Sequence, residues 1–126
     1  MRTIMYEDCN NNTTFLKGLF DQVQALSTTE LNWSIMNLDF IPVYKGDFVG
    51  GVPSDEMEQL YNFKEKILDE HIVIVTHTDF MNYLKNIRTV EEGKLEVLIS
   101  GKPLKIKIFD GDIIEIDGEM EDKLQL

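Results

Sequence analysis

The stretch Lys94-Leu-Glu-Val-Leu-Ile-Ser-Gly-Lys-Pro-Leu-Lys-Ile-Lys-Ile-Phe-Asp-Gly-Asp-Ile-Ile-Glu-Ile-Asp117 decides the fold class. Apolar residues largely alternate with charged ones on either side of two turn signals, Ser100–Pro103 and Asp110-Gly111. This period of two is typical of strands that bury one face. The stretch therefore predicts a three-stranded antiparallel meander at the C-terminal end of the chain.

The turn at Asp110 constrains how the last two strands pair. A two-residue loop would mix apolar and acidic side chains on one face. A three-residue loop from Phe109 to Gly111, with Gly111 left-handed, keeps the apolar side chains together. This register places Lys105 opposite Glu115.

A second stretch, His71-Ile-Val-Ile-Val-Thr-His77, holds four consecutive β-branched apolar residues. A continuous apolar run of this length predicts a strand buried on both faces. We therefore expect it to be a central strand of the sheet. The two histidines at its ends would stand about 20 Å apart at roughly 3.3 Å per residue, so a shared metal ion is not expected.

Helical spacing of apolar residues predicts two main helices, at about 14–27 and 55–69. The apolar face of the second is expected to carry Met57, Leu60, Tyr61, Ile67 and Leu68. Residues 33–43 read as a strand that ends at Pro42 or lies on an edge of the sheet, because proline cannot donate to a ladder. Residues 78–87 fit a short helix, with an extension of the preceding strand as the alternative. The expected fold is α+β: a largely antiparallel sheet with the two main helices packed on one face.

The length of 126 residues and an ordinary apolar fraction predict one domain, 1–118, followed by an acidic tail, 119–126, that frays. The net charge of −11 disfavours binding to nucleic acid and to anionic membranes. It favours a protein partner with a basic surface. The lone Cys9 and the absence of a leader-like or membrane-spanning stretch suggest a cytoplasmic protein.

Two groups of residues are candidates for partner binding. The first is acidic and lies in the last strand and the tail: Glu115, Asp117, Glu119, Glu121 and Asp122. The second is a pair of aromatic residues in a glycine-rich loop: Tyr44 and Phe48. Exposed carboxylates would steer a basic partner, and exposed rings would anchor it.

Two other functions are weighed against protein binding. The loop Gly46–Pro53 precedes a helix and could hold a small molecule or nucleotide, but no lysine follows it in the P-loop spacing. His77 beside Asp79 follows a predicted strand, where α/β enzymes place catalytic groups, but the sequence supplies no nucleophile by spacing. No cofactor or metal is expected.

The order of elements, Trp33 near the start of a strand and the string Ile87-Arg-Thr-Val-Glu-Glu92 resemble an uncharacterised family of small Firmicute proteins. The resemblance spans most of the chain and implies no activity. The leading hypothesis is therefore a non-catalytic, acidic protein-binding module, such as a small inhibitor, immunity or anti-defence protein. The absence of a catalytic signature, together with small size and negative charge, favours a non-enzymatic role over an enzymatic one.

Overall fold

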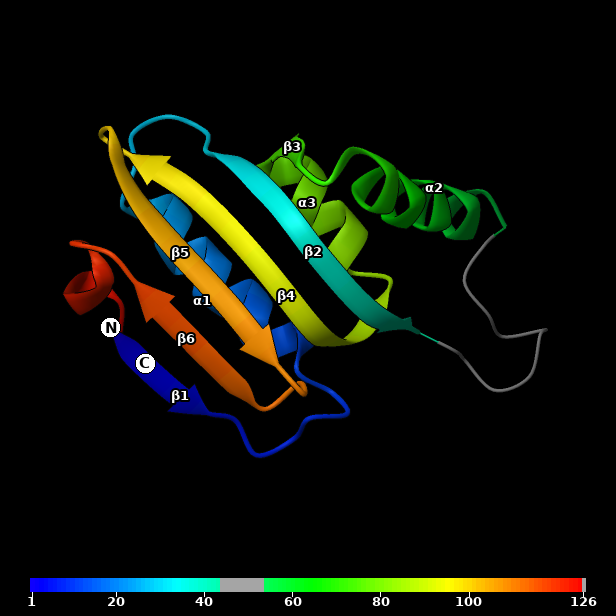
Figure 1. The fold of residues 1–126 in the computed structure, drawn as a ribbon, viewed down its shortest axis with the longest axis horizontal. Helices are drawn as coiled ribbons and strands as arrows, with labels where there is room; N and C mark the ends of the chain where they lie inside the picture. Colours follow the sequence, from blue (N-terminus) through cyan, green and yellow to red (C-terminus); the bar gives the residue numbers. More distant parts are fainter. Residues whose placement is uncertain (44–53, 126) are drawn as a thin grey trace.

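In the computed structural model, residues 1–43 and 54–125 are described, and they form one antiparallel sheet with helices against it (Figure 1). The elements run in this order: β1 (Arg2–Met5), α1 (Thr13–Ala25), β2 (Asn32–Pro42), α2 (Ser54–Glu70), β3 (Val73–Thr76), α3 (His77–Leu84), β4 (Ile87–Ile99), β5 (Lys102–Phe109), β6 (Ile113–Asp117) and the 3₁₀ turn η2 (Glu121–Lys123). The strand order across the sheet is β1-β6-β5-β4-β2-β3. The expected α+β class with an antiparallel sheet is confirmed.

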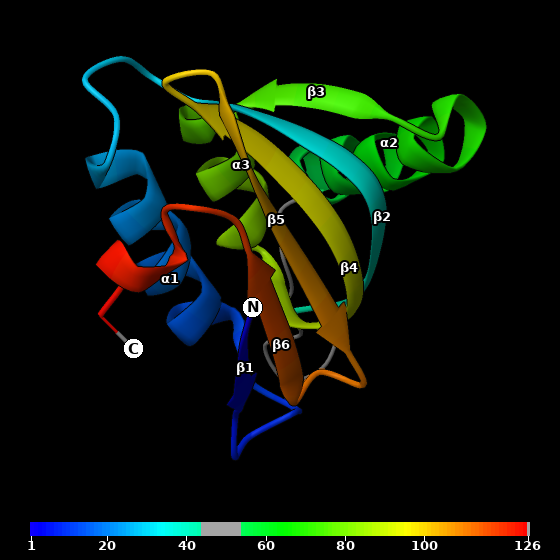
Figure 2. The ribbon, with the colours of Figure 1, turned by 60° about the vertical axis from the view of Figure 1, so that its left-hand side comes forward.

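One face of the sheet is apolar and covered, and the other is open. On β4 and β5, side chains such as Leu95, Leu104 and Ile106 are buried, while Lys94 and Lys105 are exposed. Helix α1 packs against β4 and α3, and α2 packs against β2 and β3. Figure 2 shows α1 and α3 on the same side of the sheet. The charged residues of the alternating pattern thus lie on the open face.

Strands β5 and β6 pair with a register that differs from the expected one. Phe109 lies opposite Ile113, and Lys105 lies opposite Asp117 rather than Glu115. The parity is as expected, because apolar residues still face apolar ones. The loop begins one residue later, since Asp110 (φ 54°) joins Gly111 (φ 74°) in the left-handed region. Aspartate tolerates that region better than most residues, so Phe109 stays in the ladder.

Strand β3 is an edge strand, so the prediction of a central strand here is wrong. It pairs with β2 alone, through Val73 opposite Ile35 and Val75 opposite Trp33. Val73 is buried on the covered face, but the side chain of Ile74 on the other face is 68% exposed. His71 lies before the strand, at a left-handed turn with φ 64°. The apolar run therefore does not reflect burial on both faces.

Helix α2 turns to the core a face that matches the expected one only in part. Leu60 and Ile67 are buried as expected and Phe63 joins them, whereas Tyr61 and Leu68 are 44% and 61% exposed. A spacing of three and four residues places the buried set on one side of a helix. In the described parts of the chain, no helix is long and apolar enough to cross a membrane.

The C-terminal residues are packed, unlike the frayed tail expected from the sequence. Leu124 is 3% exposed and belongs to the core. Arg2 Nη1 donates to the carbonyl oxygens of Glu121 and Leu124, at 3.1 and 2.7 Å. Gln125 and Gln22 exchange two hydrogen bonds between the tail and α1. These contacts hold residues 119–125 against the body of the domain.

Candidate functional site

Some of the acidic residues predicted to bind a partner form ion pairs with positive groups of the same chain. Glu119 lies 2.8 Å from Lys102 Nζ, and Glu121 lies 2.9 Å from the amino group of Met1. These contacts lower the pKa of Glu119 and raise the pKa of the Met1 amino group, in each case chiefly through the hydrogen bond to the partner. Asp122 is exposed in the 3₁₀ turn.

The two acids of β6 also face basic neighbours across the strand pair. Glu115 is opposite Lys107, and Asp117 is opposite Lys105, while the Met1 amino group lies 4.0 Å from Asp117. Positive and negative residues therefore mix on this part of the open face. The aromatic candidates Tyr44 and Phe48, and the whole of the Gly46–Pro53 loop, lie outside the described residues.

His77 is engaged by residues other than Asp79. The Trp33 indole N–H donates to Nδ1 of His77 at 3.1 Å, and His77 Nε2 lies 2.9 Å from Asp21 Oδ1. An indole N–H can only donate, so Nδ1 is unprotonated and Nε2 carries the proton given to Asp21. The imidazole is 8% exposed and stands at the start of α3. Its geometry is that of a buried link between α1, β2 and α3.

Asp79 belongs to the cap of α3. Its backbone N–H donates to Thr76 Oγ1 at 3.2 Å, and the Thr78 N–H donates to Glu30 Oε1 at 2.9 Å. The bond from Thr78 lowers the pKa of Glu30. In the described part of the chain, no hydroxyl or thiol is hydrogen-bonded to His77. The hydrogen bonds of His77 thus go to Trp33 and Asp21 rather than to Asp79, and the small-enzyme alternative stays a prediction.

A groove that the sequence analysis did not identify runs between β3 and α2. It has a volume of about 460 Å³ and its walls come from both elements. Its lining residues are Asn32, Gln59, Asn62, Phe63, Lys66, Val73, Ile74, Val75, Thr76, Asp79 and Tyr83. The rings of Phe63 and Tyr83 stack in parallel with centroids 4.0 Å apart. We call this hollow the β3–α2 groove.

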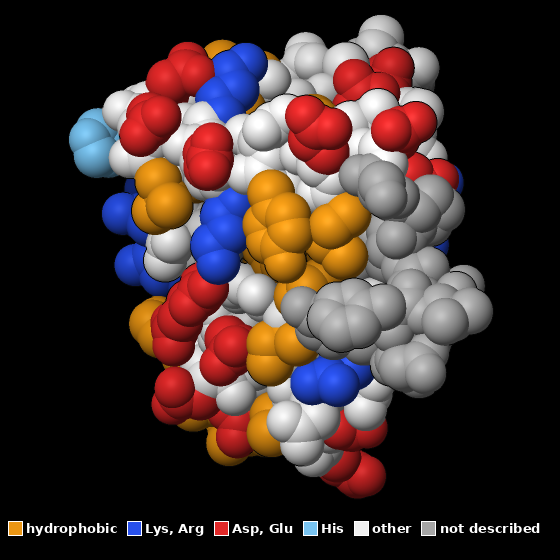
Figure 3. Space-filling model, turned by 90° about the vertical axis from the view of Figure 1, so that its right-hand side faces the viewer, with side chains coloured by type: hydrophobic (Ala, Val, Ile, Leu, Met, Phe, Trp, Pro, Cys, Tyr) orange, Lys and Arg blue, Asp and Glu red, His pale blue; other side chains and the backbone are white. Residues whose placement is uncertain are grey.

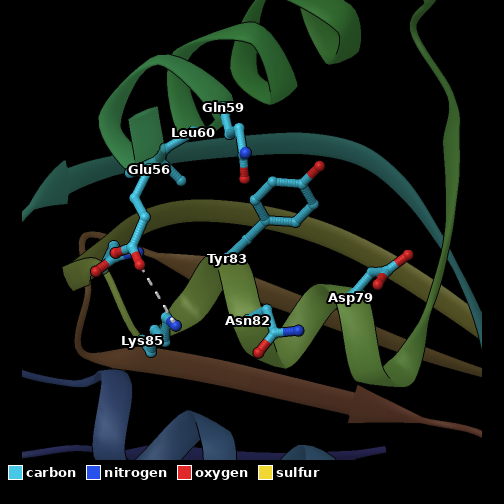
Figure 4. A pocket seen from close by; sticks show the side chains of 8 residues that line it. Glu56, Gln59, Leu60, Asp79, Asn82, Tyr83 and Lys85 are labelled. Carbon is cyan, nitrogen blue, oxygen red and sulfur yellow. Dashed lines mark hydrogen bonds and ion pairs between the residues drawn. The ribbon is translucent and has the colours of Figure 1, made fainter. Parts of the chain in front are cut away.

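A second hollow, of about 350 Å³, continues the groove between α2 and α3 (Figure 4). The two hollows share Gln59, Asp79 and Tyr83. In Figure 4, Tyr83 points from α3 toward α2, and Glu56 reaches from α2 toward Lys85. Glu56 accepts a hydrogen bond from Asn86 at 3.0 Å and lies 3.8 Å from Lys85 Nζ. The carboxylates of Glu56 and Asp79 make this end unfavourable for a phosphate group.

On the other side of β3, an apolar patch lies on the open face of the sheet. It consists of Ile72, Ile74 and Leu98, which are 54%, 68% and 61% exposed and line one hollow of about 570 Å³ together with Met36. Glu30 and Glu96 line the same hollow. We call these three exposed residues the open-face patch. Exposed apolar side chains grouped around a hollow together with polar ones are a feature of some protein-binding sites.

The side of the molecule that carries α2 is acidic. Figure 3 shows acidic side chains around a group of hydrophobic ones on this side. Helix α2 contains two lysines, Lys64 and Lys66, against six acids: Asp55, Glu56, Glu58, Glu65, Asp69 and Glu70. Acids therefore outnumber bases along the helix that forms one wall of the groove.

Neither a metal site nor a known relative points to a function. Among the described residues, no three His, Cys, Asp or Glu side chains are arranged to hold a metal ion. Comparison with known proteins finds no matching family model, no matching curated protein and no matching solved structure.

Proposed function

We propose that this chain is a non-catalytic protein-binding module that binds a basic partner at the β3 end of its sheet. The observation that carries the proposal is the open-face patch, where Ile72, Ile74 and Leu98 are all more than half exposed around one hollow. Burying apolar surface contributes about 25 cal/mol per Å². Such a patch lowers the solubility of a free chain and stabilises a complex.

Charge supports a basic partner for this surface. The chain carries a net charge of −11, and the hollow at the patch is lined by Glu30 and Glu96. Opposite charges accelerate association and disfavour acidic competitors. This keeps the expected class of function, an acidic inhibitor or a related module, but moves the contact surface from the acids of β6 and the tail to the neighbourhood of β3.

The test compares two pairs of exposed apolar residues at opposite ends of the sheet. The immobilised chain captures proteins from a lysate of the organism that makes it, and the captured protein is then purified and its Kd measured by calorimetry. Replacing Ile72 and Leu98 with asparagine should weaken binding by about tenfold or more. Replacing Met5 and Phe109, which are 68% and 39% exposed at the opposite end of the open face, should leave the Kd unchanged.

Two results would refute the proposal. The first is that no protein is retained in a way that depends on Ile72 and Leu98. The second is that both asparagine pairs weaken binding equally, which would indicate general adhesion by exposed apolar side chains rather than a specific surface.

A further inference from the structure

We infer that the partner contributes an extended, basic segment that adds to the sheet as a further strand along the outer edge of β3, in the β3–α2 groove. This rests on the proposed protein-binding function and names the part of the partner that is bound. The inference depends on the direction of the backbone groups of β3, the absence of lysine, proline or a bulge from this strand, the second wall formed by α2, and the charge of the groove.

The pairing of β2 with β3 determines which backbone groups of β3 face outward. The His77 N–H donates to the Leu31 carbonyl oxygen at 2.9 Å, so this residue pair lies at a hydrogen-bonded position of the ladder. Hydrogen-bonded and non-hydrogen-bonded pairs alternate in antiparallel strands. Val75 and Val73 therefore point their backbone groups toward β2, and Ile74 points its N–H and C=O to the outer edge.

The outward groups of Ile74 have no hydrogen-bond partner within the described residues. Sheet edges are often protected from other strands by lysine, proline, a bulge, a very short strand or a covering helix. The sequence of β3, Val-Ile-Val-Thr, is short, but it contains neither lysine nor proline, and its register with β2 is regular. Among the described residues, the outward backbone groups of Ile74 are therefore available to a strand from another chain.

Helix α2 provides the second wall that a bound strand needs. Phe63 and Lys66 of α2 line the groove together with Val73 and Val75 of β3, and the ring of Tyr83, which also lines it, stacks on Phe63. Successive side chains of an added strand point to opposite faces. One set would enter the groove against Phe63 and Tyr83, and the other would extend the open face beside Ile74. Main-chain pairing with pockets for alternate side chains is an established mode of peptide recognition.

Charge distinguishes a basic segment from a second copy of this chain. Pairing β3 with β3 of a second copy would bring two chains of net charge −11 together, with their acidic α2 helices close to the contact. Acids outnumber bases around β3, because Asp79, Glu30 and Glu96 line the hollows on its two sides against Lys66. A segment in which apolar residues alternate with lysine or arginine matches both the groove and its charge.

The test uses a displayed library of short random peptides selected on the intact protein. The selected peptides should alternate apolar and basic residues. Ile74→Pro removes the outward N–H without removing a bond to β2, and edge strands tolerate proline in that orientation. It should weaken peptide binding by about tenfold or more. Ile74→Ala retains the N–H and serves as the matched control, with a much smaller loss.

Hydrogen exchange on the wild-type protein gives a readout that does not depend on a variant folding. The amide of Ile74 should exchange rapidly in the free protein and slowly in the complex. Equal binding by the proline and alanine variants, or an Ile74 amide that stays unprotected in the complex, would overturn the inference. The same holds if selection yields no peptide that depends on Ile74.

Two other results distinguish this inference from the proposed function. If a captured protein depends on Ile72 and Leu98 for binding, but not on the Ile74 N–H, the proposed protein-binding function holds and the inferred strand addition is refuted. A wild-type dimer that Ile74→Pro converts to a monomer would identify the occupant as a second copy and overturn the basic segment.

Discussion

Asn12 shows how much of this fold depends on a single buried polar side chain. Its Nδ2 donates to the carbonyl oxygens of Val90 and Gly111, at 2.7 and 2.9 Å, and its Oδ1 accepts from the Val90 N–H at 2.8 Å. The side chain is fully buried at the start of α1. It therefore joins that helix to β4 and to the turn between β5 and β6.

We expect Asn12→Ala to lower the free energy of unfolding by about 2–4 kcal/mol, because each buried polar group left unpaired costs about 1–3 kcal/mol. Urea unfolding followed by circular dichroism measures the change. Asn11→Ala is the matched control, since Asn11 is exposed and its side chain lies 3.5 Å from Asp8. That variant should stay within about 0.5 kcal/mol of the wild type. Similar losses in both variants would argue against this role of Asn12.

At the scale of the element, the clearest prediction concerns the middle strand of the β4–β5–β6 unit. Ile106 is fully buried between Leu95 and Ile116 on the neighbouring strands, while Lys105, the residue before it, is exposed on the open face. Ile106→Ala should cost about 2–5 kcal/mol, and Lys105→Ala less than about 1 kcal/mol. Thermal and urea unfolding of the two variants should rank them in this order, and the reverse order would refute the assignment of faces.

The sequence predicted these strands because alternation depends on local residues alone. Residues 94–117 carry a period of two that only one burial pattern satisfies. The predicted register of β5 and β6 differs from the observed one by two residues. Asp110 and Gly111 both adopt positive φ, and the alternation of faces is the same for loops of equal length that start one residue apart. The alternation of apolar and polar residues determines which side chains share a face of the sheet, whereas the position of the loop depends on the pairing along both strands.

The sequence could not place β3, because an apolar run does not say what covers it. Val73 and Val75 face the helices, but Ile74 faces solvent. A fully apolar strand can therefore be buried on both faces or lie at an edge with one face exposed, as β3 does. The departure from alternation was the available signal for the candidate site, and distinguishing the two cases required the strand order.

At the scale of the whole molecule, the acidic residues differ in their effect on stability. Glu115 and Asp117 lie opposite Lys107 and Lys105, where opposite charges stabilise neighbouring strands. Acids at the end of α2 have the reverse effect, because the last turn of a helix favours cations and this one contains no basic residue. Charges that oppose the helix dipole beside the β3–α2 groove fit a role in attracting a partner.

The last prediction compares two charge reversals that change the net charge equally. Replacing Asp69 and Glu70 with lysine should raise stability by up to about 1 kcal/mol, by placing cations at the C-terminal end of α2. The same change should slow association with the captured basic protein, most strongly at low salt, because exposed charges act over about 8–10 Å at ordinary ionic strength.

Replacing Glu115 and Asp117 with lysine should instead lower stability. The new lysines would face Lys107 and Lys105 across the β5–β6 pair, and each such pair of like charges costs about 0.2–1 kcal/mol. This variant should slow association less than the reversal at the end of α2. Stopped-flow association rates across ionic strength, with thermal unfolding of both variants, measure the two effects together. If both reversals slowed association equally, net charge alone would steer the partner and the acids at the end of α2 would have no special part in it. If only the β6 reversal slowed association, the contact surface would lie at the other end of the sheet, because steering charges act most strongly on the partner closest to them.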